Sequence, residues 1–143
     1  MACPFFFPTQ RHQRELWACR ARLPLGDGWT GRCAAPGHDG AVPSDDELRD
    51  GCNLGYASTC PRLPREREAD AVHFSVAADR GGIISLRYAL ERDHAPAGHG
   101  CLEYDRSAAR WSGPPPDPRL QALARSYLQA YLARRPRSNG AEG

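Results

Sequence analysis

The sequence predicts a small single domain of the α+β class: a loop-rich half that carries cysteines, then an antiparallel β-hairpin and a C-terminal amphipathic helix. Apolar residues alternate along two runs after residue 70 and recur at helical spacing after residue 117. Five of the six cysteines precede residue 61. We therefore expect one metal-binding domain over 1–135, divided into a cysteine half (1–70) and a hairpin-and-helix half (71–135). A disordered tail is expected over 136–143.

The composition indicates a globular, soluble chain and excludes several chemistries. With 143 residues, 41% hydrophobic and 25% charged, the chain is long enough to bury a core. The basic residues are all arginines, which suggests a GC-rich genome and excludes a P-loop or Schiff-base lysine. The net charge is only +2 and acids alternate with arginines over 65–68, so nucleic-acid binding is weakly supported. No apolar run approaches the roughly 18 residues that span a membrane.

The first eight residues are apolar, but prolines interrupt them and they include no basic n-region. We therefore expect no signal peptide and a cytoplasmic, reducing location. In that location, six cysteines indicate metal or redox use rather than a disulfide framework. Burial of one phenylalanine contributes about 1.5–3 kcal/mol, so the Phe5–Phe7 run should pack down as an extended arm that carries Cys3.

A helix and a glycine-rich loop are expected next. Thr9 is placed to cap a helix that runs to about Ala21. A loop punctuated by glycines follows over 25–33 and continues to Pro43. Its glycines allow sharp turns before Cys33.

A second, short helix is predicted from a capping box. Ser44 stands at the N-cap position and Glu47 three residues later. We expect a two-turn helix over 45–50, with Gly51 as the residue that ends it. This helix should deliver the chain directly into Cys52.

The second half begins with a predicted hairpin. Residues 71–77 and 84–90 each alternate apolar and polar side chains, and 79–82 is a glycine-containing turn between them. The expected inner face consists of Val72, Phe74, Val76, Ile84, Leu86, Tyr88 and Leu90. A His/Pro/Gly loop is expected over 94–100, and 101–104 is a candidate third strand.

A long amphipathic helix closes the domain. Asp117 is placed to cap it, Pro118 suits its first position, and Pro136 stops it after Arg135. Its apolar stripe is Leu120, Leu123, Ala124, Tyr127, Leu128, Tyr131 and Leu132. The simplest interpretation is packing of this stripe onto the hairpin.

The candidate site is a four-cysteine metal centre formed by Cys3, Cys33, Cys52 and Cys60. Cys52 and Cys60 share one loop with glycines and a proline, and Cys33 ends the other glycine-rich loop. Proline follows both Cys3 and Cys60, which resembles the fourth ligand of bacterial ferredoxin runs. Cys19 is the substitute for Cys3, although its helical context favours a place in the core.

The spacing favours an iron–sulfur cluster over zinc. The four ligands are separated by 29, 18 and 7 residues, and no C-x-x-C pair is present, whereas zinc modules nearly always have one. We therefore expect a [4Fe–4S] cluster, with Zn²⁺ in a structural module as the alternative. Four thiolates close the coordination sphere, so electron transfer, redox sensing or a structural role is expected, with a larger protein or redox partner.

Other catalytic chemistry is weakly supported. Cys101, at the start of the candidate third strand, is expected to fill the core outside the site. An enzyme with a Cys-centred site is a further alternative. Gly26, Gly28 and Gly31 match a dinucleotide-binding motif in letters alone, since no strand is expected before them. The remaining candidates are histidines expected at the surface, namely His12, His38, His73, His94 and His99.

Overall fold

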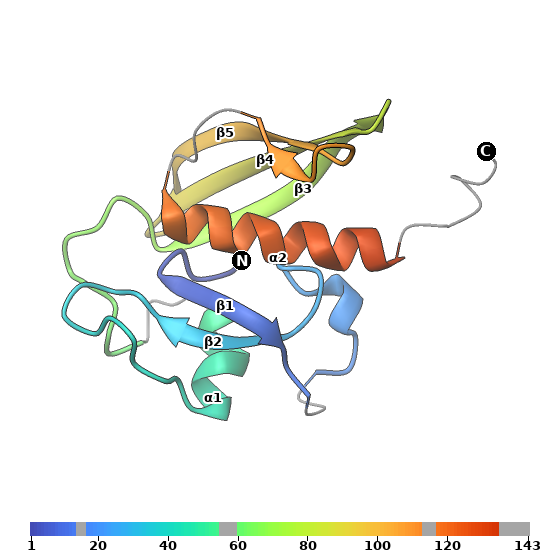
Figure 1. Ribbon diagram of the computed structural model, residues 1–143. Coiled ribbons are helices and arrows are strands. Elements are labelled where there is room, and N and C mark those ends of the chain that lie inside the picture. Colours follow the sequence, from blue (N-terminus) through green and yellow to red (C-terminus); the bar gives the residue numbers. More distant parts are fainter. Residues whose placement is uncertain (14–16, 55–59, 113–116, 135–143) are drawn as a thin grey trace.

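The structure, a computed structural model, describes residues 1–13, 17–54, 60–112 and 117–134. It contains a two-stranded sheet, a four-stranded sheet and a long C-terminal helix, α2 (Pro118–Arg134). Figure 1 shows α2 running between the two sheets. The predicted α+β class is therefore confirmed. Within the described residues, no helix is long and apolar enough to cross a membrane.

The N-terminal arm is a strand rather than the start of a helix. Strand β1 (Phe6–Arg11) pairs antiparallel with β2 (Trp29–Cys33), and the register shifts between Pro8 and Gln10. Phenylalanine and threonine favour extended backbone, and a two-stranded sheet offers the edge position that a proline requires. Phe6 is buried, so the arm packs down as expected.

Two expectations for this region were wrong. The helix predicted from Thr9 to about Ala21 is absent from its described part, where the chain forms β1 and later a 3-10 turn (Arg20–Arg22). Residues 14–16 of that helix lie outside the described residues. The loop predicted over 25–33 is a strand in its second part. Pairing with the phenylalanine-rich arm therefore outweighs the local glycine signal.

Close packing explains two of these glycines. A Cβ on Gly31 would lie 2.1 Å from the carbonyl oxygen of Phe7, so β1 and β2 approach each other only because this side chain is absent. A Cβ on Gly28 would lie 2.1 Å from the ring of Trp17. The glycines that resemble a dinucleotide-binding motif are thus needed for packing.

The larger sheet has the strand order β3-β4-β5-β6. Its strands are β3 (Ala71–Arg80), β4 (Ile83–Arg92), β5 (Ala95–Asp105) and β6 (Arg110–Trp111). The hairpin and the third strand are confirmed. The loop predicted over 94–100 was wrong, because all but its first residue belongs to β5. Glycines at 98 and 100 hid this strand, since they weaken strand propensity while leaving room for Leu90 and Tyr88 on the neighbouring strand.

Helix α2 covers the inner face of this sheet. The Asp117 carboxylate accepts the backbone N–H of Arg119 at 2.7 Å, which confirms the predicted cap. Tyr127 stacks on Phe74 of β3, with ring centroids 5.7 Å apart, and the Tyr131 hydroxyl donates to Asp79 at 2.6 Å. The fully buried core side chains include Phe6, Leu25, Val72, Ile84, Leu86 and Leu123, which come from both halves of the chain. The predicted stop at Pro136 and the tail over 136–143 lie outside the described residues.

Candidate metal centre

Four cysteines line one cavity. Cys3, Cys33, Cys52 and Cys60 surround a space of about 20 Å³, together with Phe5, Phe6, Pro43, Gly51 and Arg62. These are the four residues that the sequence predicts as ligands. They come from the N-terminal arm, from the end of β2 and from the two ends of the 52–60 loop. All six cysteines of the chain are free thiols.

Cys3 is held between the two halves of the molecule. Its neighbour Ala2 forms a two-way bridge with Val72 of β3, through N–H to oxygen distances of 2.9 Å in both directions. The backbone N–H of Cys3 donates to the carbonyl oxygen of Cys52 at 3.1 Å. These bonds fix the arm at residue 3 and set two of the four thiols next to each other.

Cys52 ends a short helical segment that begins at the predicted capping box. Helix α1 (Asp45–Glu47) continues directly into a π-type turn, η2 (Leu48–Cys52). The Ser44 side chain accepts the N–H of Glu47, and the Glu47 carboxylate accepts the N–H of Ser44. The capping box is therefore confirmed, but Gly51 does not end the helix, because the turn extends through it to Cys52.

Asn53 anchors this turn to β2 and was not anticipated. Its side chain is fully buried. The carboxamide accepts the N–H of Trp29 at 2.9 Å and donates to the carbonyl oxygens of Trp29 and Leu48, each at 2.9 Å. One side chain thus meets the backbone of two segments, immediately after a candidate ligand. In sequence, asparagine after a cysteine in a glycine-rich loop suggests only a turn.

Cys33 and Cys60 are fixed by tight local turns. The N–H of Cys33 donates to Ala41 at 2.8 Å, and the carbonyl of Cys33 accepts from Gly40 at 2.8 Å. The carbonyl oxygen of Cys60 accepts the N–H of Leu63 at 3.1 Å. Residues 55–59, which join Cys60 to Cys52, lie outside the described residues.

A backbone N–H group points at one of the sulfur atoms. Ala35 donates to Sγ of Cys33 at 3.4 Å. At Cys3, the backbone N–H groups of Phe5 and Phe6 lower the pKa of the thiol, but by less than burial raises it. Hydrogen bonds to cysteine sulfur favour the thiolate, and in iron–sulfur proteins they are one determinant of the reduction potential.

Without a metal, raised pKa values keep the thiols of Cys3 and Cys52 in their protonated form. Burial raises the pKa of Cys3 to about 12, and the nearby Cys60 and Cys33 thiols add to this shift. Burial likewise raises the pKa of Cys52, with further contributions from Cys3 and Cys60. Metal binding must therefore displace protons from sulfur.

The thiols surround the cavity without forming a finished ion site. Within the described parts of the chain, no group of three or more His, Cys, Asp and Glu side chains is arranged to hold a metal ion. A tetrahedral zinc ion with Zn–S near 2.3 Å sets its sulfur atoms about 3.8 Å apart. The cavity of about 20 Å³ has room for one water-sized particle. Coordination therefore requires the cysteine side chains to turn inward.

The other two cysteines lie away from this cavity. Cys19 and Cys101 are both exposed, so the expectation that they fill the core was wrong. Cys19 precedes a 3-10 turn instead of lying inside a helix, and Cys101 is on the outer face of β5. His12, expected on an exposed helix face, is buried and lies 3.4 Å from Asp45.

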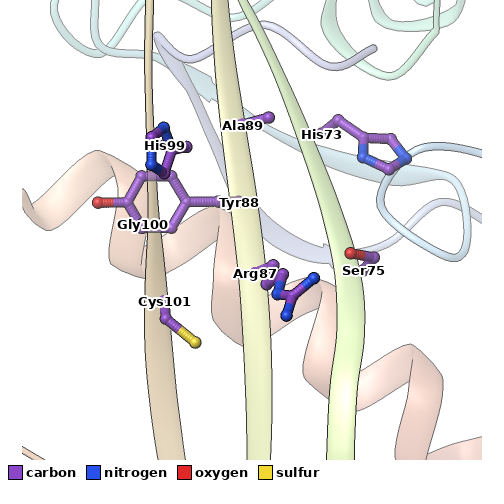
Figure 2. Close-up of a pocket in the computed structure, with 8 residues that line it drawn as sticks. All are labelled: His73, Ser75, Arg87, Tyr88, Ala89, His99, Gly100 and Cys101. Carbon is purple, nitrogen blue, oxygen red and sulfur yellow. The ribbon is translucent and has the colours of Figure 1, made fainter.

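A second hollow, on the outer face of the larger sheet, has a volume of about 510 Å³. Figure 2 shows His73 on β3 and His99 on β5, on opposite sides of β4, with Ala89 between them. Cys101 lies in the adjacent row, paired with Arg87. Among the described contacts of this hollow, no histidine is hydrogen-bonded to Cys101, as an activated nucleophile requires. The exposed position of His73 was predicted correctly.

Comparison of the chain with protein-family models, with curated proteins and with solved structures returns no match. The functional argument therefore rests on the cysteine cavity.

Proposed function

We propose that this chain binds a metal centre through Cys3, Cys33, Cys52 and Cys60, that the centre is a [4Fe–4S] cluster, and that its role is electron transfer, redox sensing or structural support. The observation that carries the proposal is the convergence of these four thiols on one cavity, although up to 29 residues separate successive ligands in the sequence. Two of the six cysteines stay outside it, so the convergence is selective.

Three features favour the cluster. The ligands come from separate segments and include no C-x-x-C pair, which is the usual zinc arrangement. Phe5 and Phe6 form an apolar wall of the cavity, and protection from solvent is one way in which a protein sets a cluster's potential. The backbone N–H of Ala35 already points at Sγ of Cys33, and those of Phe5 and Phe6 favour the Cys3 thiolate.

One observation favours zinc as a second candidate. A cavity of about 20 Å³ fits a single ion, whereas a cluster of four irons and four sulfides needs the ligand segments to move apart. A zinc site with four thiolates is structural, because no coordination position remains open.

The deciding experiment is metal and sulfide analysis of protein purified without oxygen. We expect about four irons and four sulfides per chain, which is the composition of one [4Fe–4S] cluster. The protein should also show broad absorbance at about 400 nm. One zinc per chain without sulfide would refute the cluster and support the structural module. Protein that takes up neither iron nor zinc would refute the metal centre.

Cysteine variants test the ligand assignment. Cys52→Ser and Cys60→Ser should lose the metal, because each removes a thiolate of a closed site. Cys101→Ser and Cys19→Ser are matched controls, since both thiols are exposed and lie outside the cavity. Full metal content in both Cys52→Ser and Cys60→Ser would contradict the assignment, as would metal loss in Cys19→Ser.

The cellular setting follows from the same chemistry. Six free thiols are compatible with a reducing compartment, so we place the protein in the cytoplasm. A closed cluster reacts by exchanging electrons, which requires a protein partner rather than a bound substrate.

A further inference from the structure

Arg62 is the charged residue among those that line the cysteine cavity. It follows Cys60 by two positions, and its guanidinium is within electrostatic range of the Cys33 and Cys60 thiols. Its side chain is 22% exposed. The remaining lining residues are the four cysteines, Phe5, Phe6, Pro43 and Gly51, none of which supplies a fixed charge.

The capping box of α1 holds this guanidinium in place. Nη1 of Arg62 lies 3.0 Å from Oε2 of Glu47. The other oxygen of the same carboxylate, Oε1, accepts the N–H of Ser44 at 2.9 Å. Glu47 therefore joins the helix start to the arginine.

A closed four-thiolate centre creates a charge that needs compensation. Four thiolates exceed the charge of a Zn²⁺ ion or of an oxidised [4Fe–4S]²⁺ core by two negative units. When the cluster accepts one electron from an external reductant such as dithionite, it becomes [4Fe–4S]⁺ and the excess rises to three. An arginine stays protonated in proteins, so it is a constant positive charge beside this excess.

We propose that Arg62 is the residue that sets the electrostatics of the metal centre: its fixed positive charge stabilises the four-thiolate site and favours the reduced state of the cluster. This inference rests on the metal centre proposed above. Glu47 is the positioning residue that keeps the guanidinium at the cavity wall.

The position of Arg62 at the cavity distinguishes it from Arg49, an arginine that forms surface ion pairs. Arg49 lies on η2, the turn that carries Cys52, and it pairs with Asp46 at 3.3 Å and Asp50 at 3.0 Å. Arg49 does not line the cavity. The two arginines thus stand on neighbouring segments and have similar ion pairs, but Arg62 alone of the two is at the cavity wall.

The test compares Arg62→Gln with Arg49→Gln, which makes the same change of charge, and with Arg62→Lys, which keeps the charge. Each protein is reconstituted anaerobically with iron and sulfide, and its reduction potential is measured by dithionite titration with redox mediators. Arg62→Gln should lower the reduction equilibrium constant about tenfold, or about 59 mV for one electron. Arg49→Gln should change it less than about twofold because Arg49 does not line the cavity. Arg62→Lys should recover most of the loss.

Equal potentials for Arg62→Gln and Arg49→Gln would overturn the inference while leaving the cluster assignment intact. A wild-type protein that holds no metal fails at the earlier step and overturns both. If the wild-type protein holds zinc, the same three variants are titrated with a competing chelator. A zinc affinity about tenfold weaker in Arg62→Gln than in Arg49→Gln then supports the role of Arg62, and equal affinities refute it.

Discussion

Asn53 offers the sharpest test of how the cysteine half (residues 1–70) is held together. Its fully buried carboxamide makes three hydrogen bonds, to the N–H and carbonyl of Trp29 and to the carbonyl of Leu48. Asn53→Ala removes all three. The Leu48 carbonyl keeps a partner, since it also accepts the backbone N–H of residue 53 at 3.0 Å. The two groups of Trp29 lose this partner.

Each buried polar group left without a partner costs about 1–3 kcal/mol, so Asn53→Ala should lower the free energy of unfolding by about 3 kcal/mol. For a chain of this size that is a fall in Tm on the order of 10 °C. Asn53→Asp should destabilise at least as much, because a carboxylate oxygen would face two carbonyl oxygens. Urea denaturation followed by tryptophan fluorescence, with chelator present, measures both.

Leu54→Ala is the matched control, because Leu54 is the next residue and is 40% exposed. Its effect should stay within about 0.5 kcal/mol. If Asn53→Ala unfolds within about 0.5 kcal/mol of the wild-type protein, the role of Asn53 as the anchor of the Cys52 turn is refuted.

Three further results are expected. Metal-free protein should lose stability as pH rises above 9. The Cys3 thiol of the unfolded chain ionises near its ordinary pKa of 9.0, whereas the pKa of the folded thiol is raised to about 12. The free energy of unfolding should therefore fall by about 1.4 kcal/mol per pH unit per thiol. A pH-independent urea midpoint between about pH 9 and about pH 10.5, or an equal slope in Cys3→Ser, would contradict this. Gly31→Ala should destabilise by about 1–3 kcal/mol, because its Cβ would meet the Phe7 carbonyl at 2.1 Å. Gly51→Ala, with open space around it, should stay within about 1 kcal/mol. Urea denaturation of the two variants measures the difference, and equal stabilities would refute the packing argument. Elemental analysis should show that Cys33→Ser loses its bound metal and that Cys19→Ser retains it. Metal loss in both variants would show that the exposure of a cysteine in the metal-free fold does not indicate whether it is a ligand.

The convergence of the four cysteines was predictable in part because local backbone signals surround three of them. Glycines, prolines and a capping box surround Cys33, Cys52 and Cys60, and each sets the backbone near its own cysteine. The alternating runs of the hairpin and the stripe of α2 were predictable for a similar reason, since burial on one face imposes a period on the sequence. These local patterns can be recognised without knowing which distant residues are in contact.

The features that the sequence does not reveal depend on contacts between distant segments. Strand β1 exists because Phe6 pairs with Cys33, 27 positions later, and no local pattern distinguishes that outcome from a helix beginning at Thr9. The roles of Asn53 and Arg62 have the same origin. Each acts on a segment far away in sequence, and a single asparagine or arginine in a loop indicates neither partner.

The position of the cysteine cavity explains why metal binding should stabilise the whole fold and not only a loop. Cys3 is tied through Ala2 to β3 of the larger sheet, whereas Cys33 ends β2 and Cys52 ends η2. A metal bound to all of them would therefore connect the larger sheet, the two-stranded sheet and the short helix at one point. Because the unfolded chain cannot preserve this arrangement, the free energy of binding adds to the free energy of folding. In the metal-free chain, the backbone hydrogen bonds of Ala2 and Cys3 hold this arrangement. In the proposed metal centre, Arg62 would offset the charge that ligation creates.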